Sequence, residues 1–240
     1  MFLHNAVLVA IVAAAVAALI WVYRRDQRRL RAQRSRLFTA CLSLFDQPQQ
    51  SSDALGYPVL TGWYRGQRFH IDAVVDHIAV RKVPSLWLRV SLLAHLPEFA
   101  TLDILMRSQN VEFYSPANDL PHRVEVPAGW PVDAVIHTDD PENMLPAEVI
   151  TPHLDFFRQP QAKEMLVTPK GLRLVYQASQ ADKLHYQVLR QADFAAPVLA
   201  PELLRQLLER LMALLAAVEA ASPAAKPTGG VDLGADHRLA

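Results

Sequence analysis

The 240-residue chain has very little cysteine and glycine, and it lacks the common catalytic motifs. Its single cysteine, Cys41, excludes an internal disulfide, a zinc ribbon and a redox CxxC motif. Its eight glycines are too scattered for a phosphate-binding loop, and no G-x-S-x-G sequence offers a serine nucleophile. These absences favour a non-enzymatic protein that binds or assembles, and we predict no cofactor.

No lysine or arginine precedes the first apolar stretch, and residues 6–23 carry no charge. About 20 apolar residues cross a ~30 Å hydrocarbon core, so a transmembrane helix is predicted over 6–23, after a short N-terminal segment, 1–5. A cleaved signal peptide would carry its positive charge first, so we interpret the stretch as the signal anchor of a single-pass protein. The alternative is a buried helix of a water-soluble domain.

Seven arginines and one aspartate follow within residues 24–36. The positive-inside rule then predicts a body in the cytoplasm, and the alanine- and arginine-rich composition is typical of a bacterial inner-membrane protein. The opposite orientation, with a periplasmic body, is the alternative. The expected membrane-interface residues, beside the lipid bilayer as partner, are Trp21, Tyr23, Arg24, Arg25, Arg28, Arg29 and Arg31.

The rest of the chain holds 17 basic and 23 acidic residues and is therefore mildly acidic. A nucleic-acid-binding domain would carry a basic face, so we predict no nucleic acid as partner.

Composition divides the remainder into four parts. An Arg-rich membrane-proximal helix is predicted over 24–47, a polar linker over 48–54, a globular domain over 55–221 and a disordered tail over 222–240.

The globular domain is predicted to be α+β: one antiparallel-sheet-rich domain with a long C-terminal packing helix, following the transmembrane helix. Glycine turns predict two hairpins, 57–64 with 67–74 and 164–168 with 172–176. Further strands are predicted over 86–93, 101–107, 111–114, 133–138 and 185–190. Asp140 before Pro141 predicts the start of an interrupted helix, and a leucine stripe predicts a core helix from Pro201 to Val218.

Three histidines are each followed two residues later by an aspartate. Side chains at i and i+2 of a strand face the same way, so each pair could contribute to a metal site. The candidate ligands are His70, Asp72, His137, Asp139, His153 and Asp155. Separate surface or capping roles are the expected alternative, because metal motifs such as HExxH have tighter spacing. A membrane-tethered metal-dependent hydrolase would require at least three of these residues in one cleft.

Four segments resemble uncharacterised bacterial single-span membrane proteins with an α+β domain. They are Gly62–Gly66, Val80–Trp87, Asp139–Pro141 and Val167–Arg173. The resemblance implies a fold and a bacterial source but no activity. We therefore expect a membrane-anchored partner-binding or assembly module, with a protein partner or self-association, and the metal-dependent hydrolase as the alternative.

Overall fold

The computed structural model describes residues 2–76, 83–96, 99–108, 112, 114–181, 194 and 198–222, without the side chains of residues 2–6, 8 and 9. The strand predicted over 185–190 lies outside these residues, as do part of the strand predicted over 111–114 and the predicted tail from 223 onward.

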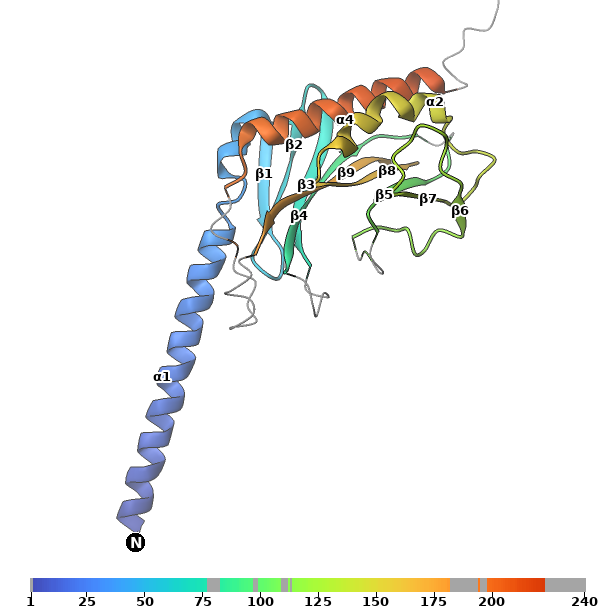
Figure 1. Cartoon of the computed structure of the whole chain (residues 1–240). Helices are drawn as coiled ribbons and strands as arrows, with labels where there is room; N and C mark the ends of the chain where they lie inside the picture. The colour runs from blue at the N-terminus through green and yellow to red at the C-terminus, as the bar shows by residue number, and fades with distance from the viewer. Residues whose placement is uncertain are drawn as a thin grey trace, which may run out of the picture.

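Among the described residues, nine strands form one antiparallel sheet, and the chain is α+β overall (Figure 1). The strand order across the sheet is β1-β2-β3-β4-β9-β8-β5-β7-β6. The strands are β1 (Asp46–Ser52), β2 (Pro58–Tyr64), β3 (Gln67–Val75), β4 (Ser85–Leu93), β5 (Leu102–Met106), β6 (His122–Val124), β7 (Ala134–Thr138), β8 (Ala162–Thr168) and β9 (Gly171–Gln180). Both predicted hairpins are confirmed, as β2–β3 and β8–β9.

Helices cover one face of the sheet, which Figure 1 shows with α4 lying across it. They are η1 (Thr39–Leu44), α2 (Ala147–Ile150), η2 (Thr151–Arg158) and α4 (Pro201–Ala221). Because the helices cover only one face, burial alternates along β4. The residues between its buried apolar positions are half-buried, and those positions, which are fully buried, are Leu86, Leu88, Val90 and Leu92. The predicted C-terminal helix is confirmed, because its leucine stripe packs into the same core.

The first helix, α1 (Phe2–Arg34), ends earlier than the predicted membrane-proximal helix, which was expected to reach residue 47. The chain turns, and Leu37, Phe38 and Cys41 enter the core of the body. The Leu199 backbone N–H donates to the Leu37 carbonyl at 2.9 Å, which ties this segment to the start of α4. Burial raises the pKa of Cys41 to about 11, and its thiol donates to the Leu199 carbonyl at 3.4 Å.

The predicted linker, 48–54, is instead mostly strand, because β1 pairs with β2 from Asp46 to Ser52. Every residue of β1 is exposed, and the pairing is irregular near Gln47, whose φ is 50°. Its polar composition and Pro48 resemble a linker, yet both are tolerated on an edge strand, where one row of backbone groups faces solvent.

The helix predicted from Asp140 begins later, at Ala147 after Pro146. Asp140 accepts instead from the Glu142 backbone N–H at 3.0 Å and from the Asn143 amide, which closes a local turn. The side chain of an aspartate before proline can cap a helix or close an Asx turn, and here it closes an Asx turn.

Among the residues that the structure describes, no helix has both the length and the apolar character to cross a membrane. The transmembrane helix over 6–23, the single-pass signal anchor and the inner-membrane location with a cytoplasmic body are therefore wrong predictions.

Candidate functional site

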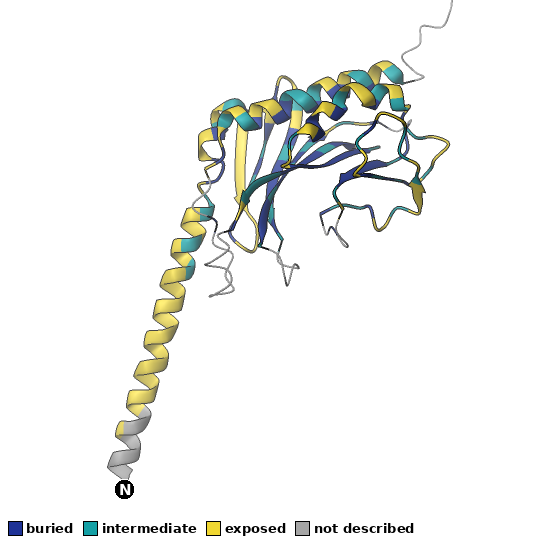
Figure 2. Ribbon diagram, viewed as in Figure 1, coloured by how far each residue is buried: buried dark blue, intermediate teal, exposed yellow. Residues whose placement is uncertain are grey.

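The described apolar residues of α1 up to Tyr23 are exposed to solvent, and the helix projects away from the body (Figures 1 and 2). Leu19 is 70% exposed and Trp21 60%. The residues predicted for a membrane interface, Trp21, Tyr23, Arg24, Arg25, Arg28, Arg29 and Arg31, are likewise exposed on α1. The Arg25 guanidinium lies 5.4 Å from the centre of the Trp21 ring. Exposed apolar surface on this scale is typical of an interaction site.

Where α1 meets the body, its last turn packs closely on the turn between β1 and β2. Arg34 donates to the Leu55 carbonyl at 2.6 Å, and its guanidinium lies 4.8 Å from the centre of the Tyr57 ring. Gln50 of β1 donates to the Ser35 carbonyl at 2.9 Å. We call this set of contacts the joint, because it fixes the direction in which α1 leaves the body.

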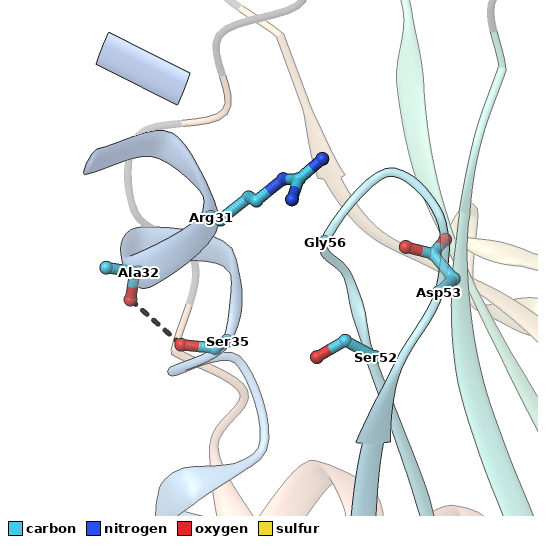
Figure 3. A pocket seen from close by; sticks show the side chains of 6 residues that line it. All are labelled: Arg31, Ala32, Ser35, Ser52, Asp53 and Gly56. Carbon is cyan, nitrogen blue, oxygen red and sulfur yellow. Dashed lines mark hydrogen bonds between the residues drawn. The ribbon is translucent and has the colours of Figure 1, made fainter. Parts of the chain in front are cut away.

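An open hollow of about 400 Å³ lies within the joint. Figure 3 shows it between α1 and the β1–β2 turn, with Arg31 extending toward Gly56. Its lining is Arg31, Ala32, Ser35, Ser52, Asp53 and Gly56. Asp53 accepts from the Tyr57 backbone N–H at 2.7 Å, so it shapes the turn. Small-molecule pockets are mostly enclosed and bury most of their ligand, so this open hollow is better explained as part of the joint.

The three histidine–aspartate pairs do not form one site. Among the described residues, no group of three histidine, cysteine, aspartate or glutamate side chains is placed to hold a metal ion. The hydrolase alternative required such a group. The six candidates lie on β3 (His70, Asp72), on β7 and just after it (His137, Asp139), and on η2 (His153, Asp155).

Each of the three aspartates already has a structural partner. Asp72 forms an ion pair with Arg89 of β4, and Asp155 accepts from Arg210 of α4 at 2.8 and 3.0 Å. Asp139 accepts from the Thr101 backbone N–H at 2.8 Å. These contacts join neighbouring elements, which accounts for the aspartates without a metal ion.

The sheet face opposite the helices carries a buried carboxyl pair that the sequence analysis missed. Asp103 of β5 and Glu164 of β8 are both fully buried. Arg173 of β9 donates to the two Glu164 oxygens at 2.9 and 3.2 Å. Burial, followed by the charge of Glu164, raises the pKa of Asp103 to about 7. Burial also raises the pKa of Glu164.

A second ion pair lies beside this pair, between Lys163 and Glu112 at 2.9 Å. The Tyr114 hydroxyl donates to Glu112 at 2.9 Å, so residues beyond β5 are bound to β8 through charged contacts. Three buried polar atoms find no hydrogen-bond partner among the described residues: Trp87 Nε1, Asp103 Oδ1 and His137 Nδ1. A single charged residue inside an apolar strand, such as Asp103 between Leu102 and Ile104, was the sequence feature that could have indicated this buried charged network.

No family model matches the chain, and no curated protein matches it. A similar solved structure is the crystal structure of the mycobacterial trehalose monomycolate transport factor A, TtfA. It shares 11% identity over 83% of this chain and 99% of the other, with a TM-score of 0.38. A likeness at this level transfers neither fold detail nor function.

Proposed function

We propose that this protein is a non-enzymatic assembly module that associates with further copies of itself through α1. The observation that carries the proposal is the exposed apolar surface of α1. Its large exposed apolar residues include Val7, Val12 and Ile20, which at ~100° per residue are separated by about 80° to 140° around the helix. A helix that is apolar all round requires cover all round, which several neighbouring helices provide.

Two further features favour a structural role. Homo-oligomers are the commonest assemblies of folded chains, so a second copy is the simplest source of a matching apolar helix. The joint holds α1 in one direction relative to the sheet through contacts made by Arg34 and Gln50. Bodies attached to a bundle of α1 helices would then occupy fixed positions, as an assembly requires.

Sedimentation velocity of the full chain tests the proposal. We expect an oligomer, and we expect Leu19→Lys with Ile20→Lys to give a monomer whose body keeps its melting midpoint. Val132→Lys is the matched control, because Val132 is a highly exposed apolar residue of the body (95%) and its replacement should leave the oligomer intact. An oligomer that survives the α1 changes contradicts the proposal. So does a monomer that associates only with phospholipid vesicles.

A further inference from the structure

A short segment crosses the sheet face that the helices leave open. We call residues 112 and 114–117 the strap. Tyr114 and Ala117 of the strap cover Leu105 of β5 and Val175 of β9, in an apolar cluster separate from the main core. Trp87 of β4 packs against this cluster, with its ring centre 5.3 Å from that of Tyr114. The strap therefore hides an apolar floor formed by three different strands.

Polar contacts fasten the strap to the carboxyl pair beneath it. The Ser115 hydroxyl donates to Asp103 Oδ2, and Arg173 donates to the Tyr114 carbonyl at 3.0 Å. Arg173 contacts Glu164 with the same guanidinium group. One buried network thus holds both the strap and two carboxyl groups.

The charge of this network is unfavourable when both carboxyl groups are ionised. Asp103 and Glu164 are fully buried, and burial of an ionised carboxylate is costly unless it is paired and hydrogen-bonded. Arg173 pairs with Glu164, whereas Asp103 Oδ1 finds no partner among the described residues. A proton on Asp103 removes the repulsion, and opening of the strap would instead give the carboxylate access to water.

We propose that the strap is a pH-controlled cover, closed over the apolar floor while Asp103 is protonated and released when Asp103 loses its proton. Release would expose Leu105, Val175 and the ring of Trp87.

The direction of the pKa shift agrees with this geometry. Burial and Glu164 raise the pKa of Asp103 from 3.8 to about 7, against the lowering effects of Ser115 and Arg173. Because the pKa is raised in the closed state, the proton stabilises the closed strap fully below about pH 3.8. This stabilisation is lost as the pH rises through about 7. With an ordinary pKa in the open state, the opening equilibrium rises by up to about tenfold per pH unit across this range.

Other titratable groups face the pair and need separate control. His137 of β7 is the direct cross-strand partner of Asp103, and burial, followed by Arg123, lowers its pKa. Arg89 of β4 acts on Glu164 by its charge. The strap and β8 contribute Glu112, Tyr114 and Lys163, which interact with one another. Among these, His137 has a pKa lowered from its ordinary value of 6.5, so it needs a control variant of its own.

Hydrogen–deuterium exchange of the full chain, corrected for intrinsic exchange rates, measures opening of the strap. We expect protection of the strap to fall by about tenfold or more between roughly pH 5 and pH 7.5, while α4 keeps its protection. Asp103→Asn, a neutral isostere of the protonated side chain, should keep the strap protected throughout. Glu164→Gln should move the step to lower pH, because it removes one cause of the raised pKa.

Two controls separate the strap from general effects of charge. Glu202→Gln neutralises an exposed carboxylate on α4 and should leave the step unchanged. His137→Gln should also leave it unchanged if Asp103 is the titrating group. Protection that does not change with pH overturns the proposal, as does a step that persists in Asp103→Asn. If Asp103→Asn does not fold, a step that stays in place in Glu164→Gln overturns it equally.

Discussion

The backbone of Gly56 lies directly against the side chain of Arg31, so that a Cβ added to Gly56 would meet the Arg31 Cγ at 2.7 Å. Gly56 also has a φ of +83°, in the left-handed region that favours glycine. The β1–β2 turn thus needs glycine twice, once for its own conformation and once for the approach of α1. The joint depends on this contact between a turn of the body and the last part of α1.

We expect Gly56→Ala to loosen the joint without unfolding the body. Overpacking by one methyl group costs about 1–3 kcal/mol, which corresponds to roughly a 5- to 150-fold rise in joint opening. Trypsin cleavage after Arg31 and Arg34 reports this opening. Gly66→Ala is the matched control, because Gly66 has a φ of +79° but no atom within 4 Å of the added Cβ. Equal cleavage of the two variants would show that the close contact does not hold α1.

The body should fold without α1 but not without the segment that follows it. Leu37, Phe38 and Cys41 lie in the core, whereas α1 is largely exposed. A chain that starts at Ser35 should therefore melt cooperatively, and one that starts at Pro48 should not. Truncation of one buried phenylalanine already costs about 3–5 kcal/mol, of a total stability of about 5–15 kcal/mol. Circular dichroism melts compare the two, with Phe38→Ala in the full chain as an intermediate case.

The strands and α4 could be predicted from the sequence because each has a strong local signal. The alternation from Leu86 to Leu92 and the leucine stripe of α4 specify which face is buried. The boundary at 34–47 could not be predicted in the same way. The arginines and then Leu37 and Phe38 follow one another in a single helical pattern, so the sequence does not show where the exposed helix ends. The packing of Leu37 and Phe38 into the core, beside the start of α4, shows that the body begins there. The polar strand β1 was missed because an edge strand needs no apolar alternation.

Truncation to alanine in α4 should lower the free energy of unfolding at buried leucines and leave it nearly unchanged at exposed positions. Leu207 and Leu211 are buried on the face of α4 that packs into the core, whereas Gln206 is exposed. We expect Leu207→Ala and Leu211→Ala each to lower the free energy of unfolding by about 2–5 kcal/mol. Urea melts measure the change, with Gln206→Ala as control. An unchanged midpoint for both leucine variants would mean that α4 is peripheral to the core.

The candidate site was less predictable than the fold. The histidine–aspartate pairs stand out in the sequence, yet Asp72 and Asp155 form ion pairs with Arg89 and Arg210, which are distant in sequence. Asp103 and Glu164 carry no motif. They become a pair only because β5 and β8 are neighbours in the sheet, and strand order is not encoded in local pattern.

Removal of Arg173 should destabilise the protein more at alkaline than at acid pH. Loss of one partner of a buried ion pair costs about 3–5 kcal/mol when the remaining charge stays ionised. Arg173 lowers the pKa values of Asp103 and Glu164, so in Arg173→Met both carboxyl groups should hold their protons to higher pH. At about pH 5 the variant can keep both carboxyl groups neutral. The loss of unfolding free energy caused by Arg173→Met should then be well below about 3 kcal/mol.

Urea melts of Arg173→Met and the unmodified chain at about pH 5 and pH 8 measure this difference. Arg205→Met is the matched control, because Arg205 pairs with Glu202 on the exposed side of α4 and its loss should have little effect at either pH. The sign follows from the raised pKa values: proton binding stabilises the folded chain at low pH, and this contribution is lost as pH rises through the folded pKa. A cost for Arg173→Met that is equal at both pH values would mean that Asp103 and Glu164 keep the same charge throughout, contrary to the network described here.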